Sequence, residues 1–399
     1  MSGQRQVKYT RPATRNEDAG VVSGAWAPRA GSVTDSPAAF VLLGRDEEES
    51  GRAISVREYN FDSDTLLDTI HAIEMEDGRP LQLAVHPSGD GVLCSFANSC
   101  KFFEINPKGL WKLRASEREL PLLQGIGIQN CIRFSLDGSM LATGGKDGYL
   151  RVFAWPTCQL ILDEPHAHRS IQDIDISMDS AYLASTAEDS ACRVWEISKG
   201  ESIAQLQREK DEKFGYCRFS RDGAQAFLFV SITKGERGYI GVWNMVDWSK
   251  LGSKMLADAP IASLDVSRDG KSLGLGTTEG DLVVVLVRKM EATQLIGSAH
   301  SAPVTGLEFS KHGRSLLSFG ADATARISRL KKSEWKEWHL YLVLLGMIAL
   351  SALLFLAFFE SSLSDDFWKF PMGRAQPARP PPEAIWSHPT YQEPETYGL

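Results

Sequence analysis

The sequence predicts an all-β fold, a seven-bladed β-propeller, followed by one C-terminal transmembrane α-helix. Three observations lead to this prediction. Short apolar strands and Asp-containing turns recur along most of the chain. The turn residues Asp137, Asp179, Asp222 and Asp269 stand at intervals of 42, 43 and 47 residues. Near the C-terminus, residues 340–359 contain no charged side chain.

The apolar stretch at residues 340–359 is long enough to cross a membrane. At the helical rise it spans about 30 Å, the thickness of a bilayer's hydrocarbon core. A soluble core helix of this length would normally carry a polar face. Trp338 and Tyr341 stand at its beginning and Trp368 follows it. Such aromatic residues favour the headgroup level, so a transmembrane helix is predicted.

Basic residues predict the orientation of this helix. The 20 residues before the span hold five Lys or Arg and the 20 after it hold three. Positive charge collects on the cytosolic side of a membrane. The N-terminus has no apolar signal segment. We therefore expect a single-pass protein with a cytosolic N-terminal propeller and a lumenal C-terminus.

The cysteines agree with a cytosolic propeller. All six precede the span, scattered and without metal-ligand spacing. An extracellular region could form disulfides from them, whereas a reducing cytosol leaves them as small buried hydrophobic residues. We favour the second interpretation.

Composition sets the domain organisation. The net charge of −8 argues against general nucleic-acid binding, which needs a basic face. Residues 1–20 are polar and expected to be disordered, residues 21–330 should form the propeller, and residues 331–339 form a juxtamembrane segment. Seven of the 18 prolines lie in residues 360–399, a predicted Pro-rich lumenal tail that cannot form a core.

Six copies of the repeat are clear. They begin at Ala84, Phe134, Asp175, Phe219, Asp265 and Phe309. The divergent residues 24–62 can supply a seventh. One four-stranded blade cannot bury both its faces, but blades stacked in a ring can. The period and pattern resemble those of WD40 repeats.

The copy from Asp175 has the most complete WD40 signature. His168 precedes it, Asp189 lies in its second turn, and Trp195 follows six residues later. The resemblance implies that these three residues form a structural hydrogen-bond relay, with a hydroxyl from Ser185 or Thr186. We therefore expect them to be structural and predict no catalytic site.

No metal or cofactor site is predicted either. His166 and His168 with Asp163 superficially resemble metal ligands, but no further His or Cys cluster completes such a site.

A propeller on a C-terminal anchor resembles the Sec12 family of the endoplasmic reticulum membrane. The resemblance extends over nearly the whole chain. Within the family it is strongest to the plant Sec12-like branch of phosphate transporter traffic facilitators. The stretches that carry it are ILDEPHAHRSIQDIDIS, WKEWHLY and FWKFPMG, which begin at Ile161, Trp335 and Phe367.

The resemblance implies one of two functions. Sec12 proper loads GTP on the Sar1 GTPase and so starts COPII coat assembly. It uses a Gly-rich, potassium-binding loop that ends in an Asn. Here the equivalent residues 44–52 read GRDEEESGR, and no Asn occurs between Asn16 and Asn60. Three successive Glu side chains would repel a nucleotide phosphate.

We therefore expect a non-enzymatic trafficking factor that promotes exit of phosphate transporters, its cargo, from the endoplasmic reticulum. The alternative is nucleotide exchange on Sar1, with Sar1 or COPII components as partners. A purely structural scaffold also stays open.

Overall fold

The computed structural model describes residues 17–27, 38–47, 51–106, 112–116, 120–223, 226–331 and 337–363. The chain divides into two compact units, Met1–Lys331 and Lys332–Leu399. The expected Pro-rich tail from residue 364 on, residues 332–336 of the juxtamembrane segment and residues 1–16 lie outside the described residues.

The first unit consists of seven four-stranded antiparallel sheets, the blades of a propeller, which confirms the predicted fold class. The first three blades are β2 (Val21–Ala27), β3 (Ala38–Glu47), β4 (Gly51–Asn60) and β5 (Thr65–Glu74); β6 (Gln82–Val85), β7 (Gly91–Ser95), β8 (Cys100–Asn106) and β9 (Lys112–Ala115); and β10 (Gln129–Phe134), β11 (Met140–Gly145), β12 (Leu150–Ala154) and β13 (Gln159–Glu164).

The next three blades are β14 (Ile171–Ile176), β15 (Tyr182–Ala187), β16 (Cys192–Glu196) and β17 (Glu201–Gln205); β18 (Glu212–Phe219), β19 (Phe227–Lys234), β20 (Arg237–Asn244) and β21 (Lys250–Ala257); and β22 (Ile261–Val266), β23 (Ser272–Thr277), β24 (Leu282–Leu286) and β25 (Glu291–Ile296). The last blade is β26 (Val304–Phe309), β27 (Ser315–Gly320), β28 (Thr324–Arg329) and β1 (Glu17–Ala19). A short 3-10 helix (Pro121–Leu123) precedes β10.

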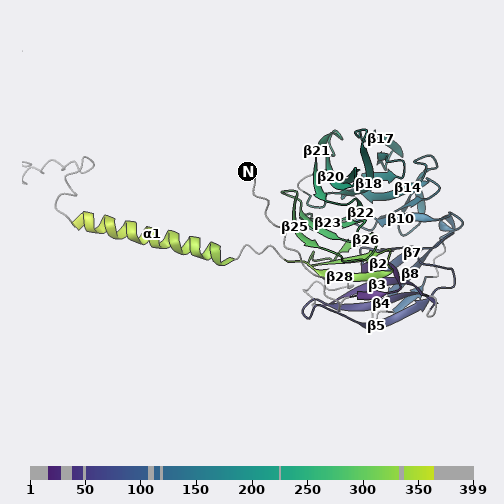
Figure 1. Ribbon diagram of the computed structural model, residues 1–399, viewed down its shortest axis with the longest axis horizontal. Coiled ribbons are helices and arrows are strands. Elements are labelled where there is room, and N and C mark those ends of the chain that lie inside the picture. The colour runs from purple at the N-terminus through teal and green to yellow at the C-terminus, as the bar shows by residue number, and fades with distance from the viewer. Residues whose placement is uncertain are drawn as a thin grey trace, which may run out of the picture. The chain divides into compact units, whose positions relative to one another are not determined.

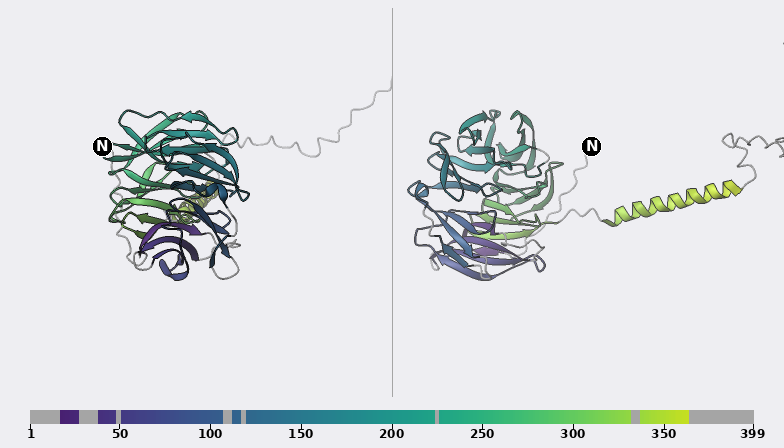
Figure 2. Two further views of the ribbon diagram at one scale, coloured as in Figure 1. Left: turned by 90° about the vertical axis from the view of Figure 1, so that its right-hand side faces the viewer. Right: turned by 180° about the vertical axis from the view of Figure 1, so that it is seen from behind.

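The first strand of each blade lies next to the first strand of the neighbouring blade, from β2 round to β26 and back to β2. Figure 1 shows the fourth strands β5, β17, β21 and β25 at the periphery, with β2, β18, β22 and β26 between them. Figure 2 gives two further views of these blades. The innermost strands therefore line the centre of the ring.

The two ends of the propeller sequence meet in the last blade. β1 pairs antiparallel with β28, with Asp18 opposite Ala325. These residues fall within the segment expected to be disordered, so the propeller begins at Glu17 rather than at residue 21. The sequence EDA has little β propensity of its own, but the exposed edge of β28 offers unpaired backbone groups that a strand can satisfy.

Side-chain hydrogen bonds explain the recurring Ser-x-Asp-Gly turn. In the third blade, Ser135 Oγ donates to Asp137 Oδ1 at 2.5 Å, and the same carboxylate accepts from the Ser139 backbone N–H at 3.0 Å. Gly138 has φ +75°, a conformation that glycine adopts without a steric penalty. Ser267 and Asp269 repeat the bond at 2.7 Å in the sixth blade. Ser177 and Asp179 repeat it in the fourth blade, so these residues fix the first turn of the third, fourth and sixth blades.

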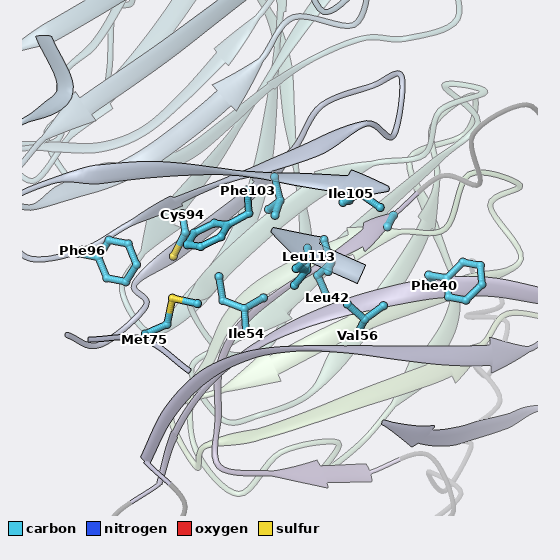
Figure 3. Close-up of a cluster of buried hydrophobic side chains, with 12 residues drawn as sticks. Phe40, Leu42, Ile54, Val56, Met75, Cys94, Phe96, Phe103, Ile105 and Leu113 are labelled. Carbon is cyan, nitrogen blue, oxygen red and sulfur yellow. The ribbon is translucent and has the colours of Figure 1, made fainter. Parts of the chain in front are cut away.

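Each blade is buried on both faces. Alternate residues of β3 point to opposite sides, because strand side chains alternate. Phe40 and Leu42 belong to a cluster with Phe103 and Ile105 of the second blade (Figure 3), whereas Val41 and Leu43 belong to a cluster with Leu317 of the last blade. The propeller core is thus a ring of interfaces between blades, as the repeat pattern predicts.

The second unit contains one helix, α1 (Glu337–Leu363). Its residues Tyr341–Phe359 have a mean hydropathy of 2.8 and are long and apolar enough to cross a membrane. The helix therefore covers the predicted span at residues 340–359.

Candidate functional site

The residues expected to correspond to the exchange loop form the tip of the β3–β4 hairpin. β3 and β4 pair continuously from Ala38 opposite Asn60 to Glu47 opposite Gly51. Residues 44–47 and 51–52 are thus strand rather than loop, and residues 48–50, with Glu48 and Glu49, lie outside the described residues. The expectation of a loop from 44 to 52 is corrected to strand at residues 44–47 and 51–52. A long hydrogen-bonded pair of strands is more rigid than an irregular loop.

Two arginines hold the end of this hairpin. Arg52 Nε lies 3.1 Å from Asp46 Oδ1, and Arg79 Nε lies 3.3 Å from Asp46 Oδ2. The Asp46 backbone N–H donates to Gly20 O at 3.0 Å, which ties β3 to the connection entering the first blade. The acidic side chain of Asp46 is therefore neutralised by two cations at the hairpin end.

The structure brings three of the predicted relay residues together. His168 Nε2 lies 2.7 Å from Ser185 Oγ, and Trp195 Nε1 donates to the same oxygen at 2.8 Å. Ser185 rather than Thr186 supplies the hydroxyl, since Thr186 Oγ1 donates to the carbonyl of Asp173 at 3.3 Å. The relay connects the loop before β14 to β15 and β16.

Asp189 does not join this relay by a hydrogen bond among the described residues. Its carboxylate accepts from the Ala191 backbone N–H at 3.0 Å, and buried His168 Nδ1 has no hydrogen-bond partner in the described part of the chain. Burial and, to a smaller extent, Arg193 lower the pKa of His168 to about 4, although Asp189 opposes both. The imidazole is therefore neutral at physiological pH.

A second relay in the last blade was not anticipated from the sequence. His300 Nδ1 lies 3.2 Å from Asp322 Oδ1, and His300 Nε2 lies 2.8 Å from Ser318 Oγ. The separation of 18 residues between His300 and Ser318 nearly repeats the 17 between His168 and Ser185. That spacing was the signal available in the sequence. The absence of a Trp after Asp322 hid it, because Ser328 stands there.

A network of buried charges near the centre of the ring was also missed. Asp173 of β14 accepts from the Cys217 backbone N–H of β18 at 3.1 Å and from Arg218 Nη1. Asp175 accepts from the Phe219 backbone N–H at 2.8 Å. Carboxylates of the fourth blade therefore bind backbone donors of the fifth.

The same type of contact joins the later blades. Asp265 of β22 accepts from the Phe309 backbone N–H at 2.9 Å, and its carboxylate lies 3.7 Å from Arg218 Nε. Glu308 of β26 accepts from the Trp26 backbone N–H at 3.0 Å. Innermost strands are thus joined across three further blades by side chains rather than by strand pairing.

Burial shifts the acidity of this network. It raises the pKa of Asp173 to about 7, opposed by Arg133 and by the Cys217 N–H. Burial also raises the pKa of Asp265, again opposed by Arg133. Removing charges from water disfavours the ionised form, and a nearby cation restores it. The carboxylates therefore depend on the arginines for their charge at neutral pH.

The remaining candidates do not form a metal site. Asp163 lies 3.4 Å from Arg151, the His166 backbone N–H donates to Glu164 at 3.0 Å, and His168 belongs to the relay. Among the described residues, no group of three or more His, Cys, Asp or Glu side chains could hold a metal ion. All six cysteines are thiols, five of them buried.

Comparisons with known proteins add to this geometry. Residues 124–153, 157–196 and 293–327 match the WD domain, G-beta repeat model. SEC12-like protein 1 of Arabidopsis thaliana is 36% identical over 373 residues, which cover 90% of this chain and 92% of that protein. SEC12-like protein 2 of the same plant is 35% identical over 257 residues, 63% of this chain and 65% of its own.

A further relative corrects one expectation. Guanine nucleotide-exchange factor SEC12 of Rattus norvegicus is 24% identical over 290 residues, 65% of this chain and 69% of its own. Exchange factors act catalytically. The expectation that the chain is not an enzyme was drawn from the altered hairpin sequence alone. It is therefore wrong, because relatives that match 63–65% of the chain carry an exchange-factor name.

The resemblance noted in the sequence is confirmed over most of the chain, including both the propeller and the apolar helix. This chain belongs to the family of SEC12-like proteins.

Proposed function

We propose that this chain acts in export of membrane proteins from the endoplasmic reticulum, by promoting nucleotide exchange on a small GTPase of the Sar1 class. The extended similarity to SEC12-like protein 1, with weaker similarity to exchange factors named SEC12, is the observation that carries the proposal. Phosphate transporters are the cargo we propose, on the resemblance to the plant branch. COPII components would act downstream of the GTPase.

The β3–β4 hairpin is the part of the propeller that we expect to act on the GTPase. At its described end, Asp46 pairs with Arg52 and Arg79. An ordered hairpin can enter a nucleotide site at lower entropic cost than an unpaired loop. The absent Gly run and Asn mean that the displacing group differs from that of the Sec12 loop. The acidic residues of the hairpin then compete with phosphate for the Mg²⁺ and the cationic groups of the GTPase site.

The test measures release of fluorescent GDP from purified Sar1 by the full chain in detergent micelles. We expect wild type to accelerate release and Asp46→Asn to reduce this acceleration severalfold, because Arg52 and Arg79 lose their shared partner. Asp247→Asn is the matched control, since Asp247 lies in an exposed turn of the fifth blade and the charge change is the same. GDP release no faster than without the chain would refute exchange.

A cellular arm of the same test addresses the cargo. In plant cells that lack the chain, phosphate transporters should remain in the endoplasmic reticulum, and wild type should restore their exit better than Asp46→Asn. Equal retention of an unrelated plasma-membrane protein would argue that export is general rather than directed at phosphate transporters.

The proposal places the propeller in the cytosol and the C-terminus in the lumen of the endoplasmic reticulum, as the excess of Lys and Arg before the span predicts. Protease added outside intact microsomes should digest the propeller and leave a protected fragment that contains α1 and the residues after it. A protected propeller would exclude contact with a cytosolic GTPase.

A further inference from the structure

One face of the propeller is defined by where the chain leaves it. Neighbouring strands are antiparallel, so the turns after the first and third strands of every blade lie at one end. β28 is the third strand of its blade, and the chain leaves the propeller there, at Lys331. We call this end the exit face, and the end with the turns after second and fourth strands the hairpin face.

The exit-face turns of the last two blades form one continuous surface. The Leu330 backbone N–H donates to Arg314 O at 2.8 Å, and the Val287 backbone N–H donates to Lys271 O at 2.9 Å. The Lys331 backbone N–H donates to Gln294 Oε1 at 3.1 Å. These bonds bring the turns of the sixth blade, the turns of the seventh blade and the departing chain together.

This surface is strongly basic. Eight exposed cationic residues lie in or beside these turns: Arg268, Lys271, Arg288, Lys289, Lys311, Arg314, Arg329 and Lys331. The acidic residues described in the same area are Asp222, Asp269 and Glu291, with Asp62 and Asp64 in the adjoining turn of the first blade, where Phe61 contacts His312. The Asp269 carboxylate accepts a hydrogen bond from Ser267 Oγ, and its other oxygen lies 3.7 Å from Lys271 Nζ. We call the eight residues the basic patch.

The basic patch is not a consequence of general composition. The whole chain has a net charge of −8. On the hairpin face, the described turns of the same two blades carry Glu279, Asp281 and Asp322 and no Lys or Arg. The two faces of blades six and seven therefore carry charge of opposite sign.

Most charges of the basic patch are available for a partner. Among the described residues, only Lys271 of the eight lies within 4.0 Å of a carboxylate. Exposed cations that outnumber the carboxylates around them create a positive potential that attracts anionic surfaces.

We propose that the basic patch binds anionic phospholipid headgroups of the membrane that α1 enters. Tyr341, where the span begins, stands ten positions after Lys331. A chain of that length reaches at most about 35 Å, so a membrane surface always lies within reach of the exit face. Lys and Arg clusters close to a membrane are attracted to anionic lipids within about a Debye length, roughly 8 Å at physiological salt.

This arrangement goes beyond the proposed function and would serve it. Binding through the exit face leaves the hairpin face, with the β3–β4 tip, directed away from the lipid. A GTPase could then approach the hairpin without meeting the bilayer.

The experiment measures energy transfer from a dye on the full chain to labelled lipid headgroups. The chain carries Cys158→Ser and a single dye site, either His312→Cys on the exit face or Glu279→Cys on the hairpin face. It is reconstituted in vesicles of phosphatidylcholine, with or without phosphatidylserine. We expect transfer from position 312 to rise at least twofold with phosphatidylserine and to fall again in high salt, while transfer from position 279 does not rise.

A matched pair of variants identifies the surface. Lys289→Glu, Lys311→Glu and Arg314→Glu together should abolish the phosphatidylserine-dependent rise. Lys146→Glu, Arg169→Glu and Lys213→Glu make the same charge change on the hairpin face and should leave the rise intact. The proposal would be overturned if the rise persists in the first variant. It would also be overturned if energy transfer in wild type does not change when phosphatidylserine is added. The second result would favour an acidic protein as the partner of the basic patch.

Discussion

Replacing Arg218 by leucine is expected to destabilise the propeller by about 3–5 kcal/mol, the cost of leaving a buried charge without its partner. Arg218 is only 4% exposed and bridges Asp173 of the fourth blade and Asp265 of the sixth. Leucine fills part of the same volume but leaves both carboxylates with fewer partners. The three innermost strands β14, β18 and β22 would lose their shared cation.

Chemical denaturation of residues 1–331, followed by tryptophan fluorescence, measures this loss. This unit closes on itself through β1 and β28 and contains all seven blades. Arg268→Leu is the control, because Arg268 is exposed in the turn after β22, and it should change stability by no more than about 0.5 kcal/mol. Equal effects of the two substitutions would show that the buried network contributes nothing specific.

The loss at Arg218 should depend on pH. Asp173 titrates near 3.9 when unfolded, and burial raises its pKa to about 7 in the folded propeller. A carboxyl whose folded pKa is raised gives its full stabilisation below the unfolded pKa and loses it as pH rises through the folded pKa. Without Arg218 the folded pKa rises further. The stability gap between wild type and Arg218→Leu should therefore be smaller at pH 6 than at pH 8.

The sequence alone contains part of the signal for this network. Charged residues stand two positions before the turn serine in five successive blades: Arg133, Asp175, Arg218, Asp265 and Glu308. Strand periodicity places these residues on a common side of their strands. The sequence does not say which of them pair, because the partners lie in different blades and more than 40 residues apart.

The blades themselves were predictable because their signals are local. Alternating apolar residues and Asp-containing turns define each hairpin within about 20 residues. Strand β1 was not predictable, because Glu17–Ala19 has no such pattern and forms a strand only against the edge of β28. The relay at His300 was missed for a related reason. Its repeat lacks the Trp, although the hydrogen bonds to Asp322 and Ser318 do not need one.

Replacing Trp195 by alanine is expected to cost about 3–5 kcal/mol. The indole is 4% exposed and packs in the cluster between the third and fourth blades, beside Ile176 and Leu183. Its removal leaves a cavity next to a buried serine hydroxyl and a neutral His168. Denaturation of residues 1–331 measures the loss.

Trp195→Phe separates packing from hydrogen bonding. Phenylalanine keeps most of the apolar ring but cannot donate to Ser185 Oγ, so this variant should lose only about 1 kcal/mol. Ser185→Ala should cost Trp195→Phe less than it costs wild type. In Trp195→Phe it removes only the bond to His168 Nε2, whereas in wild type it leaves both the indole N–H and His168 Nε2 without their partner. Fully additive losses would mean that the three residues do not act as a relay.

For the alanine variant, unchanged stability of Trp195→Ala would mean that the fourth blade does not depend on this residue.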